Sequence, residues 1–247
     1  MADLIYGRHP VLEALQSGAG VRRVLLAAGS KPGGVIAEIQ AAAAAAGVPV
    51  IEVSRQTLDR RAEGNHQGVV AEVEPFRYAD VDDVLSAAAR RDEPPLLLLL
   101  DGLQDVHNFG ALLRTAEAVG AHGVLIPKDR SVSVTATVYK TSAGAVSYLP
   151  VAQVTNLVRA MNDLKEQGIW FAGLDMAGPQ RYDQANLTGP LGIVVGAEGR
   201  GLGRLVAETC DFLVHLPMRG KIESLNASVA GSVLMYEALR QRPRPET

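Results

Sequence analysis

Six short apolar runs, separated by segments with helical periodicity, dominate the chain from residue 96 onward. The runs are LLLLLD, HGVLIP, AVSYLPV, IWFAG, LGIVVG and DFLVHLP. Strands that are apolar along their whole length and alternate with helices are typical of parallel sheets covered by helices on both faces. The clearest intervening helices are expected over residues 108–119, 155–167 and 224–240. This part of the chain is therefore predicted to be an α/β domain with a parallel sheet.

The N-terminal part of the chain has the pattern of a smaller α/β domain. A helix is expected from Pro10, an alanine-rich helix is expected to end near Gly47, and strands are expected at VRRVLLA, VPVIEV and QGVVAEV. A polar stretch flanked by prolines follows, with one expected helix at DVDDVLSAAARR. The predicted organisation is a domain over residues 1–75, a linker over 76–95 and a second domain over 96–247.

Composition excludes several classes of protein. The single cysteine, Cys210, rules out an intrachain disulfide and a cysteine-based zinc site, and the five histidines lack metal-ligand spacing, so no metal is expected. The N-terminus lacks the pattern of a signal peptide, and the longest purely apolar run, Leu96–Leu100, is far shorter than the ~20 residues of a membrane helix. A cytoplasmic protein is expected. The net charge of −3 means that any RNA-binding surface must be local.

Ligands of open parallel sheets bind where strands end, and three such junctions carry polar residues. In the first, LLLLLDGLQDVHNFGALLRTAEAVG, a strand ends at Asp101 and Asn108 is expected to cap a helix. Arg114 lies in a part of this helix that is otherwise small and apolar. The arginine could serve a ligand site, or it could form an ordinary ion pair with Glu117, and the sequence leaves both open.

The second junction, LGIVVGAEGRGLG, is a strand followed by a loop with glycines at 196, 199, 201 and 203. Such a loop either allows the backbone to approach a ligand closely or is a flexible turn. Its spacing does not fit the dinucleotide motif G-x-G-x-x-G, because position 204 is arginine, and it lacks the G-K-S/T of a phosphate-binding loop. A dehydrogenase or ATP-binding fold is therefore disfavoured.

The third junction is DFLVHLPMRGKIESLNASVAGSVLMYEALRQ, in which a strand leads through a basic loop to a helix. Ser224 and Asn226 are expected at the start of this helix. They suit helix capping, but their hydroxyl and amide groups could instead bind a ligand.

Together, NFGALLRTAEAVGAHGVLIPKDR, IVVGAEGRGLG and LPMRGKIESLNASVAGSVLMYE resemble the three motifs of the SpoU/TrmH family of RNA ribose 2′-O-methyltransferases. The segments IYGRHPVLEAL and NHQGVVAEV are similar to the start and end of the small L30e-like substrate-binding domain of its longer members. The resemblance covers nearly the whole chain. It implies a C-terminal SPOUT domain with a parallel sheet and a deep trefoil knot, and the expected substrate is a guanosine in 23S ribosomal RNA.

The resemblance also implies a site. S-adenosyl-L-methionine would bind in the knot, and the cofactor contacts would come from Gly196, Leu216 and Leu225. Arg114 would be the activating base or the organiser of the ribose and phosphate. The residues that shape the catalytic site would be Asn108, Glu198, Ser224 and Asn226. Family members are homodimers whose knotted domains pack together, with a residue of one subunit completing the site of the other, and the same is expected here.

Other functions remain open at this point. Within the family, the chain could be a transfer-RNA methyltransferase or an antibiotic-resistance methyltransferase of ribosomal RNA. A protein of another class, a non-catalytic RNA-binding protein with the same fold, is disfavoured by the intact site residues. The charged segment RGKIE before Ser224 departs from the usual third motif and puts the contacts with RNA in doubt.

Overall fold

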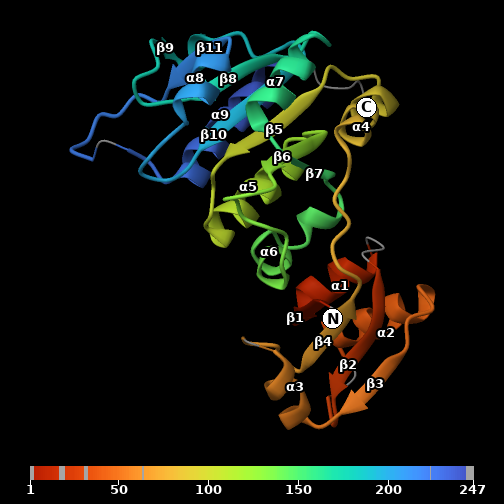
Figure 1. The fold of residues 1–247 in the computed structure, drawn as a ribbon. Coiled ribbons are helices and arrows are strands. Elements are labelled where there is room, and N and C mark those ends of the chain that lie inside the picture. Colours follow the sequence, from red (N-terminus) through yellow and green to blue (C-terminus); the bar gives the residue numbers. More distant parts are fainter. Residues whose placement is uncertain (1–2, 17–19, 31–32, 63, 223, 243–247) are drawn as a thin grey trace. The chain divides into compact units, whose positions relative to one another are not determined.

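The computed structural model describes residues 3–16, 20–30, 33–62, 64–222 and 224–242 (Figure 1). The chain divides into two compact units. The N-terminal unit lies within residues 1–77 and includes Ser133–Tyr148, and the C-terminal unit consists of Tyr78–Val132 and the segment from Leu149 onward. The predicted domain boundaries near residues 75 and 96 stay predictions.

The N-terminal unit is built on a four-stranded sheet with the order β1-β4-β2-β3. Its strands are β1 (Asp3–Tyr6), β2 (Val21–Ala27), β3 (Val50–Val53) and β4 (Val69–Val73). Its helices are α1 (Arg8–Gln16), α2 (Val35–Ala45), α3 (Arg55–Arg61), α6 (Ala136–Thr141) and the 3₁₀ turn η1 (Ala145–Ser147). The central strand β4 is antiparallel to both neighbours and buried along its length, which explains its run of apolar residues. The predicted strands and helices of this unit are present.

The C-terminal unit contains a seven-stranded sheet with the order β7-β6-β5-β10-β8-β11-β9, and every pair of neighbouring strands is parallel. The strands are β5 (Leu96–Asp101), β6 (Gly123–Pro127), β7 (Val151–Val154), β8 (Trp170–Leu174), β9 (Gln180–Arg181), β10 (Leu191–Gly196) and β11 (Phe212–His215). The helices are α4 (Val81–Arg91), α5 (Val106–Ala118), α7 (Leu157–Lys165), α8 (Arg204–Thr209), α9 (Ala227–Gln241) and η2 (Tyr182–Gln184). The predicted parallel α/β sheet is confirmed.

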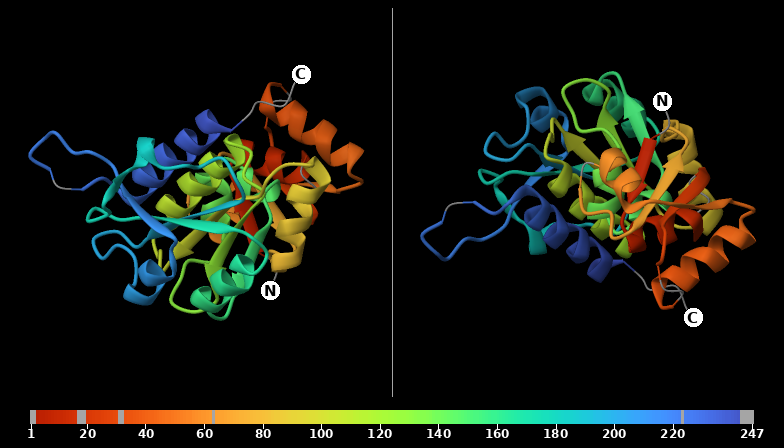
Figure 2. Two further views of the ribbon diagram at one scale, coloured as in Figure 1. Left: turned by 90° about the horizontal axis from the view of Figure 1, so that it is seen from above. Right: turned by 90° about the horizontal axis from the view of Figure 1, so that it is seen from below.

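The middle of this sheet fixes the position of the candidate site. β10 lies between β5 and β8, and all six of its residues are buried. Gly196 is paired with Asp101 of β5, and Val195 is paired with Leu174 of β8, so the three strands end side by side. Helices α5 and α9 pack against each other, and α9 also packs on β10 (Figures 1 and 2). The deep trefoil knot stays a prediction.

One predicted strand was placed too early. The run AVSYLPV forms a 3₁₀ turn at Ala145–Ser147, and β7 begins only at Val151. Gly144 precedes the turn with a φ of +86°, and Pro150 separates it from the strand. A left-handed glycine and a proline interrupt the extended backbone, although the side chains between them are apolar enough for a strand.

Among the described residues, no helix is long and apolar enough to cross a membrane.

The last helix is anchored at its C-terminal end by Arg242. The guanidinium of this arginine donates hydrogen bonds to the carbonyl oxygens of Pro94, Pro95, Leu187 and Gly189 at 2.6–3.3 Å. Burial lowers the pKa of the guanidinium from its ordinary value. The arginine thus joins the end of α9 to the segments that lead into β5 and β10.

Arg242→Ala is expected to lower the free energy of unfolding by roughly 2–3 kcal/mol, because hydrogen bonds from a charged group are lost and carbonyls are left without donors. Urea denaturation of the wild type and the variant measures this difference. Arg159→Ala is the matched control, since its side chain is 84% exposed and its contact with Asp163 spans 3.9 Å. Equal losses in the two variants would contradict an anchoring role for Arg242.

Candidate active site

A cavity of about 470 Å³ opens at the carboxyl end of the parallel sheet in the C-terminal unit. The segments that follow β8, β10 and β11 and the segment that leads into α9 line it. The three residues predicted to contact the cofactor, Gly196, Leu216 and Leu225, all lie in its wall. Glu198, Ser224 and Asn226, which were predicted to shape the catalytic site, line it as well.

The loop after β10 folds back so closely that only glycine fits at position 196. A Cβ atom at this position would lie 2.2 Å from the carbonyl carbon of Gly201 and 2.4 Å from the amide nitrogen of Leu202. The amide of Gly201 donates a hydrogen bond of 2.8 Å to the carbonyl of Ala197, and Gly199 and Gly201 have φ values of +77° and +68°. The sequence left open a flexible turn, but the loop has a defined shape that leaves backbone atoms facing the cavity.

Asp101 holds the far end of this loop. Its Oδ2 atom accepts a hydrogen bond of 2.6 Å from the amide of Gly203. The contact is made by the last residue of β5, directly beside the end of β10. Asp101 was not among the predicted site residues, although an acidic residue at the end of a buried strand was the available signal.

Asn108 lies in the first turn of α5, and the prediction that it caps this helix was wrong. The cap is Asp105, whose side chain accepts a hydrogen bond of 2.7 Å from the amide of Asn108. Because Asp105 accepts the hydrogen bond from that backbone amide, the side chain of Asn108 is not needed as a cap and can contact the residues that line the cavity. Asn108 is only 7% exposed.

Three predicted catalytic residues meet through their side chains. Asn108 donates from Nδ2 to Oε2 of Glu198 at 2.9 Å. Asn226 donates from Nδ2 to Oδ1 of Asn108 at 2.9 Å and to Oε1 of Glu198 at 3.2 Å. Because an ionised carboxylate only accepts hydrogen bonds, Glu198 fixes which way both amides point. We call Asn108, Glu198 and Asn226 the polar triad.

Ser228 supports the polar triad and was missed in the sequence. Its hydroxyl oxygen lies 3.1 Å from Oδ1 of Asn108 and 2.6 Å from Oδ1 of Asn226. Its signal was its place two residues after Asn226, in the first turn of a helix. Asn226 caps α9 by accepting from the amides of Ser228 and Val229. One asparagine therefore both starts the helix and contributes to the polar triad.

Ser224 was predicted to begin the last helix, but α9 starts at Ala227. The cap is Asn226, and Ser224 precedes it in a segment without regular structure that lines the cavity. The basic side chains of this connection, Arg219 and Lys221, are exposed. In both views of Figure 2 the connection between β11 and α9 extends away from the sheet. It is therefore accessible to a large substrate.

Arg114 does not join the other predicted residues. It is exposed on α5, and among the described residues it has no hydrogen bond or ion pair, so the ion pair with Glu117 is not formed. It does not line the cavity. It lies one helical turn beyond Ala111, which borders a second hollow on the outer face of α9. Arg114 is thus the one predicted site residue that a single chain leaves apart.

Comparison with protein families accounts for both parts of the chain. Residues 95–236 match the model of the SpoU rRNA methylase family. Residues 4–79 match the model of the RNA 2′-O ribose methyltransferase substrate-binding domain. The two matches together span most of the sequence.

Three known proteins illustrate the similarity. A Bacillus subtilis protein described as a putative TrmH family tRNA/rRNA methyltransferase is 47% identical over 242 residues, which cover 97% of this chain and 96% of that protein. The crystal structure of the SpoU methyltransferase AviRb from Streptomyces viridochromogenes in complex with AdoMet has a TM-score of 0.80 and 27% identity, covering 96% of this chain and 89% of AviRb. The TrmH/SpoU tRNA modifying enzyme of A. aeolicus has a TM-score of 0.55 and 26% identity, covering 60% of this chain and 76% of that enzyme.

Proposed function

Because this chain belongs to the SpoU rRNA methylase family and is an S-adenosylmethionine-dependent RNA ribose 2′-O-methyltransferase, we propose that it methylates a guanosine of 23S ribosomal RNA. The observation that carries the choice of ribosomal RNA is the substrate-binding domain at residues 4–79. Similarity to AviRb includes this region, whereas similarity to the A. aeolicus tRNA modifying enzyme reaches only 60% of the chain. A separate RNA-binding domain suits a large and structured RNA.

The cavity fits S-adenosylmethionine in its chemistry. Gly196 keeps side-chain atoms out of the wall, so exposed backbone groups are available to hold an adenosine moiety. Leu216 and Leu225 supply apolar surface, and the carboxylates of Asp175 and Glu198 suit a positively charged ligand. When bound, the cofactor supplies a methyl group on a sulfonium, which is an excellent leaving group.

The protein's own task is to position and activate a ribose hydroxyl, which is a poor nucleophile that must lose its proton as it attacks. The polar triad forms a rigid wall beside the cavity, and each of its members is held by the other two. A guanidinium stays protonated at neutral pH. We therefore assign Arg114 to holding the ribose and its phosphate and to stabilising the oxyanion, while the proton of the hydroxyl passes to that phosphate.

We also propose that two copies pair through the outer face of α9. Val229, Val233 and Tyr236 are 49%, 37% and 53% exposed and line one hollow of about 630 Å³ with Ala111 of α5. An exposed apolar stripe on a helix, bordered by polar residues of the same hollow, suits contact with a second protein surface. A copy seated there would lie next to Arg114, one turn beyond Ala111. In such a pair, Arg114 of one copy would complete the site of the other copy.

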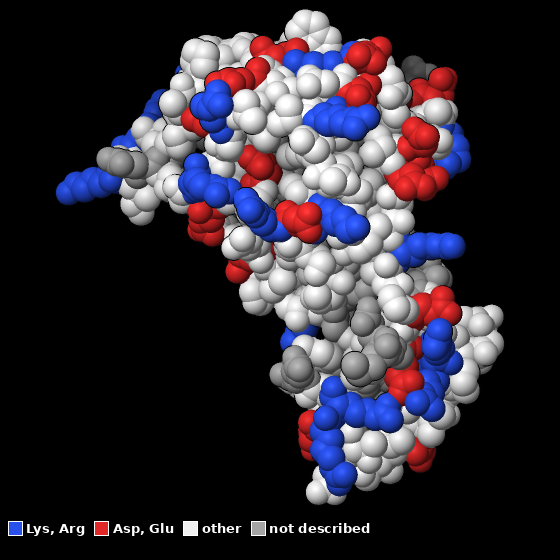
Figure 3. Space-filling view, viewed as in Figure 1, with Lys and Arg blue, Asp and Glu red and all other residues white. Residues whose placement is uncertain are grey.

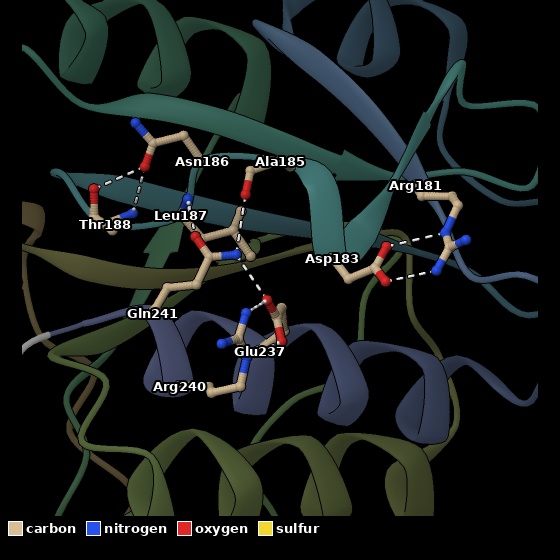
Figure 4. A network of polar contacts seen from close by, with 9 residues as sticks. All are labelled: Arg181, Asp183, Ala185, Asn186, Leu187, Thr188, Glu237, Arg240 and Gln241. Carbon is tan, nitrogen blue, oxygen red and sulfur yellow. Dashed lines mark hydrogen bonds and ion pairs between the residues drawn. The ribbon is translucent and has the colours of Figure 1, made fainter.

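Two residues that line this hollow, Glu237 and Arg240, belong to a network of polar contacts (Figure 4). Gln241 donates to the carbonyl of Ala185 at 3.0 Å and accepts from the amide of Leu187 at 2.9 Å. Glu237 accepts two hydrogen bonds from Arg240, and this arginine lowers the pKa of the Glu237 carboxyl. These contacts hold α9 against the segment that contains η2, so the apolar face is a defined surface.

Val233→Asp is expected to convert a dimer into a monomer, because it places a charge in the middle of the apolar face. Analytical ultracentrifugation of the wild type and the variant measures the change. Leu205→Asp is the matched control, since Leu205 is 56% exposed on α8 and lies outside the hollow. A Val233→Asp protein that stays dimeric would place the interface elsewhere.

The N-terminal unit offers a local basic surface for RNA. Arg23 donates two hydrogen bonds to Glu72 at 2.7 and 2.8 Å, and Arg61 contacts the same carboxylate. The hydrogen bond from Arg23 lowers the pKa of Glu72, and the two arginine side chains remain 43% and 42% exposed. Figure 3 shows lysine and arginine side chains gathered on this unit. Two arginines on one carboxylate leave a net positive charge for phosphate.

The choice of substrate is tested by methyl transfer from labelled S-adenosylmethionine to unmodified 23S ribosomal RNA and to unmodified transfer RNA under the same conditions. We expect label in ribosomal RNA and none in transfer RNA. Label in transfer RNA alone would overturn the proposal but leave the family assignment intact. An assembled large-subunit precursor is the third substrate in the assay, since a site can require the folded particle.

A further inference from the structure

Asp175 is a carboxylate in the cavity wall that the sequence motifs do not include. It follows directly after β8 and lines the same cavity as Gly196 and Glu198. Its Oδ1 atom accepts a hydrogen bond of 2.8 Å from the amide of Ala177. Its Oδ2 atom has no hydrogen-bond partner among the described residues. Glu198 differs, because each of its two oxygens accepts from an asparagine amide.

The backbone around Asp175 is held firmly. Its amide donates to the carbonyl of Val214 at 3.0 Å, and its carbonyl accepts from the amide of Gly178 at 3.0 Å. These contacts tie the residue to β11 on one side and to a tight turn on the other. The direction of the side chain is thus set by the fold, with Oδ1 committed to the turn.

The open oxygen lies beside the glycine loop. A Cβ atom built on Gly201 would lie 4.0 Å from Oδ2 of Asp175. Gly201 has no side chain, so nothing from the loop covers this oxygen at that point. Arg200, a cation in the cavity wall, approaches Gly102, since a Cβ atom there would lie 3.0 Å from its Nη2 atom. Within the described part of the chain, Asp175 has no ion pair.

Asp175 is half-buried, and its Oδ2 is open to the cavity, where a ligand that carries a hydrogen-bond donor can take the place of solvent. We propose that Asp175 is a cofactor-binding residue whose Oδ2 accepts a hydrogen bond from S-adenosylmethionine. This inference rests on that cofactor occupying the cavity. The cofactor offers three kinds of donor, the charged ammonium of its methionine part, the hydroxyls of its ribose and the exocyclic amine of its adenine. Each is a donor that a single carboxylate oxygen can accept from.

The test is isothermal titration calorimetry of the full-length protein with S-adenosylmethionine. Asp175→Asn keeps an oxygen for the amide of Ala177 but removes the charge, so the fold is preserved. We expect binding to weaken by about tenfold to a hundredfold, the usual effect of losing a hydrogen bond to a charged group. Asp163→Asn is the control, because its carboxylate is 65% exposed on α7, outside the cavity. Its affinity is expected to equal that of the wild type.

Two further ligands separate the donors. Methylthioadenosine lacks the amino acid part, and S-adenosylhomocysteine lacks the sulfonium charge but keeps the ammonium. If the ammonium is the donor, Asp175→Asn weakens both S-adenosyl compounds and leaves methylthioadenosine unchanged. If a group of the adenosine part is the donor, a ribose hydroxyl or the adenine amine, all three weaken together. A variant that binds S-adenosylmethionine within twofold of a binding-competent wild type overturns the role of Asp175, whereas a wild type that does not bind overturns the cofactor site itself.

Discussion

Arg114→Ala is expected to slow methyl transfer by on the order of 10²–10³-fold, the range of effects seen when a group that stabilises a developing oxyanion is removed. The affinity for S-adenosylmethionine is expected to stay unchanged, because Arg114 lies outside the cavity. Single-turnover transfer of labelled methyl to RNA measures the rate, and calorimetry measures the affinity. The loss would thus be confined to the chemical step and the binding of RNA.

Arg114→Lys distinguishes a positive charge from the planar geometry of a guanidinium, since lysine cannot make the same paired contacts with ribose and phosphate. We expect it to recover only a small part of the lost rate. Arg159→Ala, an exposed arginine of α7, is the matched control. A full rate in the Arg114→Ala protein would remove this residue from the mechanism and leave the polar triad to act alone.

Gly196→Ala is expected to weaken binding of S-adenosylmethionine by on the order of a hundredfold, because the added methyl cannot fit. Its Cβ atom would lie 2.2 Å from a backbone atom of Gly201. The loop must move away from β10 to relieve this contact, and the wall of the cavity moves with it. Calorimetric titration of the folded variant measures the loss.

Gly189→Ala is the control for a glycine replacement on the same unit, since a Cβ atom there would meet nothing within 4 Å. Its cofactor affinity is expected to match that of the wild type. Melting temperatures of both variants show whether the unit remains folded at the temperature of the titration. Normal affinity in a folded Gly196→Ala protein would mean that the cofactor does not use this wall.

Much of the fold could be predicted because a strand that is buried on both faces has a continuous run of apolar residues in its sequence. The runs at residues 96–101, 123–127 and 191–196 became β5, β6 and β10 of the parallel sheet. The first residues of the helices were harder to predict from the sequence. Asp105 and Asn108 are both residue types that cap helices well. The backbone conformation before α5 decides between them, and in the structure Asp105 accepts the hydrogen bond from the amide of Asn108.

The site could be predicted in its members but not in its geometry. The resemblance to the family named the three residues of the polar triad. Their contacts join positions 90 and 118 residues apart, which no local pattern reveals. Ser228, Asp101 and Asp175 were missed although each had a signal, a place in the first turn of a helix or at the end of a buried strand, because many residues at such positions have no role in a site. Arg114 is exposed and lies outside the cavity of its own chain, and only the pairing proposed above would bring it to a site.

The most direct test of the account is the identity of the methylated nucleoside. Unmodified 23S ribosomal RNA is incubated with the wild-type protein and S-adenosylmethionine, digested to nucleosides and analysed by mass spectrometry, with the position mapped by primer extension. We expect 2′-O-methylguanosine at a single position, and none after the same incubation with the Arg114→Ala protein. A methyl group on a base, or no methylated nucleoside from RNA or large-subunit particles despite measured cofactor binding, would contradict this expectation.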